Sequence, residues 1–278
     1  MKITMAENFG FCFGVKRAIK IAENTPHATT YGPLIHNKKE IDRLWRTYDV
    51  SLGEDIETFK SGDTVIIRTH GIEKEDLNYL NQKGVVLVDA TCPFVTKPQE
   101  IVEQMSNEGY DIVIFGDENH PEIKGVRSYA KGAVCVVQNI EDFGSKRLSN
   151  KIALIAQTTR KMENYQRIAS HLIANYGEVR VFNTICNATF ENQEATRKLA
   201  QSSDIVIVIG GKDSSNTRQL LYIAKEFCVE SYLVEGLEDI DPLWFRGKKM
   251  CGITAGASTP QWIIEQIHTA ISTLPTQS

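Results

Sequence analysis

The sequence lacks the features that direct a chain into or across a membrane. Its N-terminus, MKITMAENFGFCFG, has neither the charged region nor the long apolar run of a secretory signal peptide. No stretch approaches the about 20 consecutive apolar residues that a membrane-spanning helix needs. We therefore expect a cytoplasmic protein with no membrane partner.

The sequence also has little net charge. The chain of 278 residues carries 31 lysines and arginines against 35 aspartates and glutamates, a formal net charge of −4. A nucleic-acid partner is therefore not expected, and an anionic ligand must be held by local donors rather than by the overall field. With 42% hydrophobic and 24% charged residues, the composition is that of a globular protein long enough for two or three modules.

Several short motifs are missing as well. Neither G-x-x-x-x-G-K-[ST] nor G-x-G-x-x-G occurs, so a nucleotide ligand is not implied. None of the six cysteines lies in a C-x-x-C pair, which gives no sign of a zinc finger or a thioredoxin-type motif. Disulfides are not expected in a reducing compartment. The cysteines therefore need another explanation.

Three of the cysteines recur in the same local pattern. Each follows an apolar strand and precedes an amphipathic helix, in KITMAENFGFCFGVKRAIKIAE, VVLVDATCPFVTKPQE and VRVFNTICNATFENQEATRKLA. These cysteines, Cys12, Cys92 and Cys186, lie 80 and 94 residues apart, a spacing typical of repeated modules. In the second segment, the apolar run from Val85 to Val88 predicts a strand in the middle of a covered sheet.

The segments after each cysteine repeat too. A second strand with a polar end, a helix, a short third strand and a fourth strand follow each time, and another helix closes the pattern. We predict three α/β modules, at residues 1–92, 93–183 and 184–278, the last including a C-terminal tail. Alternating strands and helices imply mostly parallel sheets, which bind ligands at the carboxyl ends of their strands.

Those strand ends hold the unusual residues. The first strands lead to the three cysteines, and the second and fourth strands lead to histidines, hydroxyls and one carboxylate: His36-Asn37, His120-Pro121-Glu122, Ser214-Ser215-Asn216, Thr69-His70-Gly71, Thr158-Thr159 and Ala257-Ser258. If the three modules face one axis, these groups meet in the middle.

The chemistry of three recurring thiols has more than one interpretation. A single cysteine is most often a small buried residue, and we interpret Cys135, Cys228 and Cys251 in that way. Three thiolates acting together could hold zinc with an open position, or a four-iron cluster with one iron that the protein does not ligate. The second arrangement suits reductive or dehydrating chemistry on a hydroxyl group.

The other strand-end groups indicate an anionic ligand and an acid. Histidines, hydroxyls and an amide, with helix N-terminal N–H groups, supply donors suited to a phosphate or diphosphate. Glu122 is the only carboxylate placed at such a strand end beside a histidine. It either complements the helix dipole or passes a proton with Thr158 as a relay, and both interpretations stay open.

The ordered motifs GFCFGV, HN, THG, DATCPFVTK, HPE, QTT, CNAT, SSN and TAGAS cover about residues 3 to 270. In this order the chain resembles the 4-hydroxy-3-methylbut-2-enyl diphosphate reductase family. The resemblance implies an α/β fold of three pseudo-threefold-related modules with mostly parallel sheets, in a trefoil around a central iron–sulfur cluster. It implies reductive dehydroxylation of the substrate to isopentenyl and dimethylallyl diphosphate, the last step of the non-mevalonate isoprenoid pathway.

The resemblance also implies roles for single residues. Cys12, Cys92 and Cys186 would hold a [4Fe–4S] cluster whose fourth iron, not ligated by protein, binds the substrate's hydroxyl oxygen. Glu122 would deliver a proton, with Thr158 and His120 assisting. The substrate would be held by His36, His70, His120, Thr158, Ser214, Ser215, Asn216 and Ser258. The family takes electrons from a ferredoxin or flavodoxin, and we expect a monomer.

Two positions depart from the family pattern, and two other functions compete with it. Asn192 precedes Gln193 where an Arg-Gln pair is usual, and Asn119 stands where glycine is common, which puts the local loop shape in doubt. The alternatives are a zinc-dependent phosphohydrolase that uses the same thiols and a cluster-based sensor without catalysis. Glu122 and the phosphate donors disfavour the sensor, and a brown purified protein would disfavour zinc.

Overall fold

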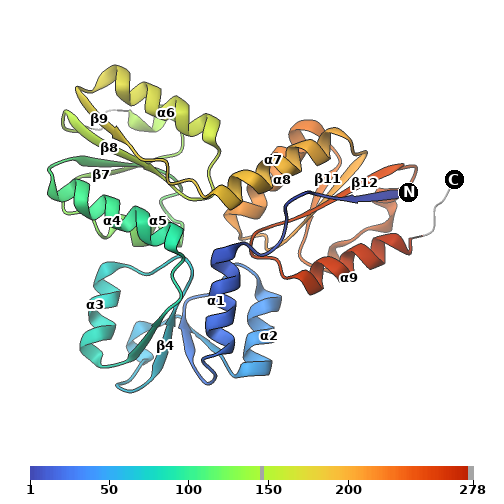
Figure 1. The fold of residues 1–278 in the computed structure, drawn as a ribbon, viewed down its shortest axis with the longest axis horizontal. Coiled ribbons are helices and arrows are strands. Elements are labelled where there is room, and N and C mark those ends of the chain that lie inside the picture. The colour runs from blue at the N-terminus through green and yellow to red at the C-terminus, as the bar shows by residue number, and fades with distance from the viewer. Residues whose placement is uncertain (145–146, 275–278) are drawn as a thin grey trace. The chain divides into compact units, whose positions relative to one another are not determined.

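The computed structural model describes residues 1–144 and 147–274 and contains three four-stranded sheets connected by helices (Figure 1). Every strand pairing in these sheets is parallel, so the predicted α/β class is confirmed. Residues 145–146 of the predicted second module and 275–278 of the predicted tail lie outside the described residues. No helix in the described ranges is long and apolar enough to cross a membrane.

The three sheets share one strand order, in which the strand that precedes a cysteine lies at one edge. The first sheet has the order β3-β2-β4-β5 and consists of β2 (Thr29–Tyr31), β3 (Ser51–Gly53), β4 (Thr64–Ile67) and β5 (Val86–Asp89). The second has the order β7-β6-β8-β9 and consists of β6 (Asp111–Phe115), β7 (Val134–Val137), β8 (Lys151–Ala156) and β9 (Glu178–Val181). The third has the order β1-β12-β10-β11 and consists of β1 (Lys2–Met5), β10 (Ile205–Ile209), β11 (Ser231–Val234) and β12 (Met250–Ala255).

Helices connect the strands in each module. The α-helices are α1 (Phe13–Glu23), α2 (Lys38–Tyr48), α3 (Lys74–Lys83), α4 (Pro93–Asn107), α5 (Pro121–Arg127), α6 (Met162–Asn175), α7 (Asn187–Gln201), α8 (Ser215–Phe227) and α9 (Gln261–Ser272). Short 3-10 turns lie where acidic segments follow the third strands, at Ile56–Thr58, Ile140–Phe143, Leu237–Asp239 and Pro242–Phe245.

The first strand pairs with the last one. Lys2 to Met5 of β1 lie in register with Met250 to Ile253 of β12. The predicted first module, residues 1–92, included this strand. In the structure the strand belongs to the third sheet instead. The reason is that alternation along the sequence shows that a strand exists but does not show which neighbour it pairs with.

The strand before Cys92 is an edge strand rather than a central one. β5 has a single neighbour, β4, and its Val86 side chain is 54% exposed. The prediction that Val85 to Val88 lies in the middle of a covered sheet is therefore wrong. A short apolar run fits an edge strand with one packed face as well as it fits a central strand.

The third sheet shows how residue alternation builds a covered sheet. β10 reads IVIVI and is fully buried: its isoleucines pack with α9 on one face, and Val206 and Val208 pack with α8 on the other. Figure 1 shows α9 on one side of this sheet and α7 with α8 on the opposite side. Isoleucines at Ile263, Ile267 and Ile271 form the buried stripe of α9.

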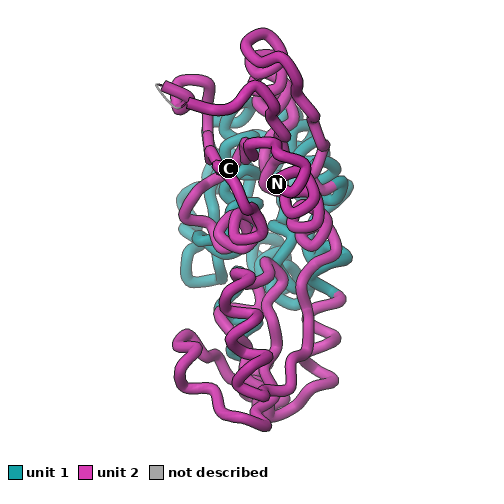
Figure 2. The backbone as a smooth tube through the Cα atoms, turned by 90° about the vertical axis from the view of Figure 1, so that its left-hand side faces the viewer, with its two compact units in different colours: residues 1–16, 36–42, 187–278 teal, residues 17–35, 43–186 magenta. Residues whose placement is uncertain are grey.

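The described chain divides into two compact units (Figure 2). Unit 1 consists of residues 1–16, 36–42 and 187–278, and unit 2 of residues 17–35 and 43–186. Unit 1 contains the third sheet, and unit 2 contains the first and second sheets. The short segment 36–42 belongs to unit 1 although the chain on both sides of it belongs to unit 2.

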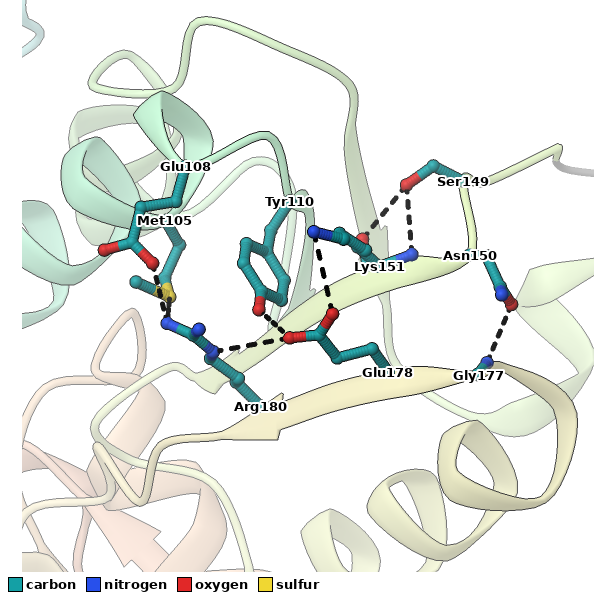
Figure 3. A network of polar contacts seen from close by, with 9 residues as sticks. All are labelled: Met105, Glu108, Tyr110, Ser149, Asn150, Lys151, Gly177, Glu178 and Arg180. Carbon is teal, nitrogen blue, oxygen red and sulfur yellow. Dashed lines mark hydrogen bonds and ion pairs between the residues drawn. The ribbon is translucent and has the colours of Figure 1, made fainter.

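Polar contacts fasten β9 to its sheet in unit 2 (Figure 3). The Arg180 guanidinium lies 2.7 Å from the Glu108 carboxylate and 4.5 Å from the centre of the Tyr110 ring, and the Tyr110 hydroxyl donates to Glu178. Single exposed ion pairs contribute only about 0–1 kcal/mol each. Together these contacts hold the edge strand that leads to Cys186.

Candidate functional site

The three recurring cysteines occupy one repeated backbone frame. Each directly precedes a helix, α1, α4 or α7. The main-chain N–H of each cysteine donates to a carbonyl that lies two residues beyond the end of a strand, which is β12 for Cys12, β4 for Cys92 and β8 for Cys186. These bonds join Cys12 to Ala257 (3.2 Å), Cys92 to Thr69 (3.0 Å) and Cys186 to Thr158 (3.0 Å). The repeat inferred from the sequence is therefore a structural repeat as well.

Burial separates these cysteines from the other three. Cys12, Cys92 and Cys186 are partly exposed, whereas Cys135, Cys228 and Cys251 are buried in the cores, as predicted. Burial raises the pKa of the Cys251 thiol to about 12, which keeps this side chain protonated at neutral pH. A thiol at a helix N-terminus is instead favoured as thiolate, the form that ligates iron.

Glu122 and Thr158 lie together in unit 2. Glu122 is only 2% exposed. Both of its carboxyl oxygens accept hydrogen bonds from Thr158, one from the main-chain N–H and one from the hydroxyl, each at 2.8 Å. Burial raises the pKa of Glu122 above its ordinary value, although the Thr158 bonds and the Arg160 charge oppose this. A carboxyl whose pKa is raised by burial is suited to hold a proton and to release it to a bound group.

Two imidazoles lie beside this acid. His120 caps α5, and its Nδ1 accepts the Glu122 main-chain N–H at 3.2 Å. A neutral imidazole that accepts at Nδ1 carries its proton on Nε2, so His120 presents a donor there. The His70 and His120 rings meet edge to face, with 5.4 Å between their centres. Glycine at position 125 permits the approach of α5 to the His70 loop, because a Cβ there would lie 3.3 Å from the Ile72 carbonyl oxygen.

The N-terminus of α8 carries neutral polar groups in unit 1. The Ser214 hydroxyl caps the helix by accepting the Thr217 N–H at 3.3 Å, and Ser215 is the first helical residue. Asn216 is 5% exposed, and neither its amide oxygen nor its amide nitrogen has a hydrogen-bond partner among the described residues. Leaving such a buried group without a partner costs about 1–3 kcal/mol, so the amide indicates a ligand site.

The His36 backbone is fixed in unit 1. The Ser258 hydroxyl donates to the His36 carbonyl at 3.2 Å. Gly211 allows its own loop to approach the same carbonyl, because a Cβ on Gly211 would lie 2.3 Å from that oxygen. The Ser214 N–H donates to the Gly211 carbonyl at 3.0 Å, which connects this contact with the N-terminus of α8.

The structure adds anchors of segment 36–42 that sequence reasoning missed. The Asn37 side chain accepts the Glu40 N–H at 3.0 Å, and the Trp262 indole N–H donates to the Glu40 carboxylate at 3.0 Å. Glu40 is 1% exposed. The Asn-x-x-Glu spacing is a capping pattern that the sequence displays. The contact with Trp262 leaves no local sequence signal.

The predicted site residues are divided equally between the units. Unit 1 holds Cys12, His36, Ser214, Ser215, Asn216 and Ser258. Unit 2 holds Cys92, Cys186, His70, His120, Glu122 and Thr158. Within units the structure brings together Glu122 with Thr158, His70 with His120, and His36 with Ser258. One site made from both sets stays a prediction.

The two departures from the expected family pattern have ordinary structural roles. Asn192 and Gln193 are both buried in α7. The Asn119 N–H donates to the Asp117 carboxylate at 3.0 Å in the turn that leads to α5.

The chain was compared with known families and sequences. The family model described as LytB protein matches residues 3–272. A protein of a Nitratiruptor species, named 4-hydroxy-3-methylbut-2-enyl diphosphate reductase, is 61% identical over 96% of this chain and 97% of that protein. A Campylobacter hominis protein of the same name is 57% identical over 99% of this chain and 100% of that protein.

Two solved structures are also similar. One is described as (E)-4-hydroxy-3-methyl-but-2-enyl diphosphate reductase, the terminal enzyme of the non-mevalonate pathway; it is 45% identical, covers 97% of this chain and 98% of its own, and has a TM-score of 0.71. The other, E-1-hydroxy-2-methyl-but-2-enyl-4-diphosphate reductase from Plasmodium falciparum, is 26% identical, covers 98% and 88%, and has a TM-score of 0.92.

Proposed function

The chain belongs to the LytB protein family, and from this premise we propose that it reduces (E)-4-hydroxy-3-methylbut-2-enyl diphosphate to isopentenyl and dimethylallyl diphosphate. The substrate takes up two electrons and two protons and loses its hydroxyl group as water. The observation that carries the proposal at the level of residues is the buried Glu122 carboxyl held by Thr158. Such a group can protonate a poor leaving group in a site that excludes water.

We assign a [4Fe–4S] cluster to Cys12, Cys92 and Cys186, with one iron not ligated by protein. Their partial exposure, their position before helices and their identical backbone frames support this assignment. When bound, the cluster would pass on the electrons of the external donor one at a time and would polarise the substrate's hydroxyl group.

The diphosphate would be held by neutral and imidazole donors. The partnerless amide of Asn216, with Ser214 and Ser215 at the N-terminus of α8, supports an anion there. The Ser258 hydroxyl donates to the His36 carbonyl, and we expect it to donate to a phosphate oxygen when the substrate binds. The remaining donors that we assign to the substrate are the imidazoles His36, His70 and His120.

Glu122 would give its proton to the departing hydroxyl oxygen, and the second proton goes to carbon. Thr158 has two effects on this step. Its N–H and hydroxyl hold the carboxyl in one orientation, and they stabilise the carboxylate that remains after transfer. His120 would orient the same region of the substrate through its Nε2–H, because its Nδ1 is occupied by the Glu122 N–H.

Electrons would come from another protein, a ferredoxin or flavodoxin, in the cytoplasm. The sequence contains neither of the glycine-rich nucleotide motifs, in keeping with an external donor of single electrons. A monomer suffices for this proposal because every assigned residue lies in one chain.

The proposal is tested by assaying anaerobically purified protein with reduced viologen and the allylic diphosphate. Two viologen molecules should be oxidised for each substrate consumed, and mass spectrometry should find both isomeric products. A protein with an intact cluster that oxidises no viologen in the presence of substrate would contradict the reductase function. Zinc in place of iron, with release of phosphate, would favour the phosphohydrolase.

A further inference from the structure

The guanidinium of Arg17 binds the main chain next to Cys92. Its Nη1 donates to the Thr91 carbonyl at 3.1 Å, and its Nη2 donates to the Asp89 carbonyl at 3.3 Å. All of these residues belong to unit 2. Arg17 is partly buried on α1, the helix that begins one residue after Cys12. Two carbonyls of one loop are therefore held by one rigid, permanently charged group.

The main-chain N–H groups of this loop are also paired. The Ala90 N–H donates to the Ile67 carbonyl at 3.1 Å, and the Cys92 N–H donates to the Thr69 carbonyl at 3.0 Å. The Thr91 N–H turns back to the Asp89 carboxylate at 2.8 Å. The N–H groups bind the sheet or the loop itself, whereas the two carbonyls depend on Arg17.

The equivalent position in the second module behaves differently. Lys97 lies five residues after Cys92, as Arg17 lies five residues after Cys12. Its side chain is 68% exposed and pairs with Glu100 at 3.3 Å on its own helix. The turn itself does recur, because the Ile185 N–H donates to the Asn183 side chain at 3.2 Å just before Cys186. The turn before Cys92 thus also occurs before Cys186, and Arg17 adds further hydrogen bonds to the one before Cys92.

We propose that Arg17 is a positioning residue for Cys92: its guanidinium clamps the Asp89 and Thr91 carbonyls and holds the Cys92 loop in the geometry that ligates the cluster. This inference rests on the proposed iron–sulfur function. A ligand loop that opens less often releases its iron less often, because the thiolate must leave the iron before solvent or a chelator can replace it.

The first test measures hydrogen exchange of the full chain for the wild type, Arg17→Gln, Arg17→Lys and the control Lys97→Gln. The amides of residues 90–92 are hydrogen-bonded and exchange through local opening. We expect this segment to exchange about tenfold faster in Arg17→Gln than in the wild type. The reason is that the substitution removes a charged hydrogen bond worth about 1.5 kcal/mol. Arg17→Lys should be intermediate, and Lys97→Gln should match the wild type.

The second test follows iron release from the cluster-loaded enzyme to a chelator under anaerobic conditions. Release should be about tenfold faster in Arg17→Gln than in Lys97→Gln, in proportion to the more frequent opening of the loop. Equal release from both variants would overturn the proposal. Faster exchange around all three cysteines alike would also overturn it, because that pattern indicates general destabilisation.

The exchange test is independent of the reductase assignment because it needs no cluster. If the purified chain held no iron, the proposed function would fail while the clamp could still be measured. If Arg17→Gln did not fold, Arg17→Lys would still test the proposal. A lysine has a single ammonium group, whereas the arginine guanidinium reaches both carbonyls. Exchange of residues 90–92 in Arg17→Lys at the wild-type rate would then overturn the clamp.

Discussion

Two helix N-termini with the same local construction carry side chains that are paired differently. In α8 of unit 1, Ser214 caps the helix and Asn216 is its second residue; in α5 of unit 2, His120 caps the helix and Glu122 is its second residue. Asn216 has a buried amide without a partner among the described residues, whereas Glu122 has both carboxyl oxygens bonded. The backbone frame places the side chain at the second helical position, and we propose that its identity decides between holding an anion and giving a proton.

Magnitudes explain why the pKa of the carboxyl in α5 is raised rather than lowered. A helix N-terminus stabilises a negative charge by about 0.3–1 kcal/mol at the surface, and α5 has only seven residues. Burial of a charged carboxylate costs several kcal/mol. Burial therefore dominates and raises the pKa of Glu122, although the Thr158 bonds and the Arg160 charge act in the opposite direction.

The largest effect is expected from Glu122→Gln. Glutamine keeps the size of the side chain and an acceptor for the Thr158 N–H but has no acidic proton. Turnover should fall by about 100-fold or more, the usual contribution of a general acid. The measurement is viologen oxidation with saturating substrate, with the cluster spectrum as a control for cofactor content. Turnover within a factor of three of the wild type would remove Glu122 from the reaction.

Asn216→Ala should weaken substrate binding more than it slows turnover. Loss of a hydrogen bond to a charged phosphate oxygen costs about 1.5–3 kcal/mol, so KM should rise by about tenfold or more while kcat changes little. Asn175→Ala is a matched control, because the Asn175 side chain is exposed and bonds its own helix. An unchanged KM in Asn216→Ala would separate α8 from the diphosphate.

Thr158→Val should change the pH dependence of the reaction. Valine removes the hydroxyl bond but keeps the N–H bond, and the hydroxyl bond lowers the pKa of Glu122. The pKa should therefore rise further, and the protonated acid should persist to higher pH. The alkaline limb of the pH–rate profile should move to higher pH, and turnover should fall several-fold. A limb that moves downward would contradict the role of Thr158.

Trp262→Phe should have a small effect on binding. The change removes the N–H that bonds Glu40 and thereby loosens segment 36–42, which carries His36. A single hydrogen bond is worth about 0.5–1.5 kcal/mol, so KM should rise about threefold. Trp244→Phe is the control, since Trp244 stacks on Tyr232 instead. Equal KM values for both variants would show that the Glu40 contact does not position His36.

The smallest change is expected in the stability of Glu122→Gln, which should increase although its activity falls. Because the folded-state pKa of Glu122 is raised, its contribution to stability is fully present below the unfolded-state pKa and is lost as pH rises through the folded-state value. Glu122→Gln removes this loss. Its thermal midpoint should exceed that of the wild type at neutral pH and approach it near pH 4. A lower midpoint at neutral pH would show that the carboxylate is stabilising.

Much of the architecture could be predicted from local sequence. The repeated strand, cysteine and helix predicted the three parallel sheets. Thr158 was named as a possible proton relay for Glu122, and the two side chains are in contact. Strand pairing is a long-range property, so the placement of β1 beside β12 and the exposure of Val86 at an edge were not accessible.

Contacts between distant side chains were equally hidden. Arg17 and Thr91 are 74 residues apart, and Glu40 and Trp262 are 222 residues apart. Neither contact is accompanied by a periodic pattern or a short motif in the sequence from which it could be predicted. The Asn37 cap differs because it acts over three residues, and its spacing could have been recognised.

The most direct test of the contrast between α5 and α8 is the equilibrium dissociation constant of the substrate, measured anaerobically for cluster-loaded Glu122→Gln and Asn216→Ala in parallel with the wild type. We predict wild-type affinity in Glu122→Gln, which does not turn over, and about tenfold weaker binding in Asn216→Ala, which does. Loss of affinity in Glu122→Gln together with unchanged affinity in Asn216→Ala would contradict the division between proton donor and anion holder.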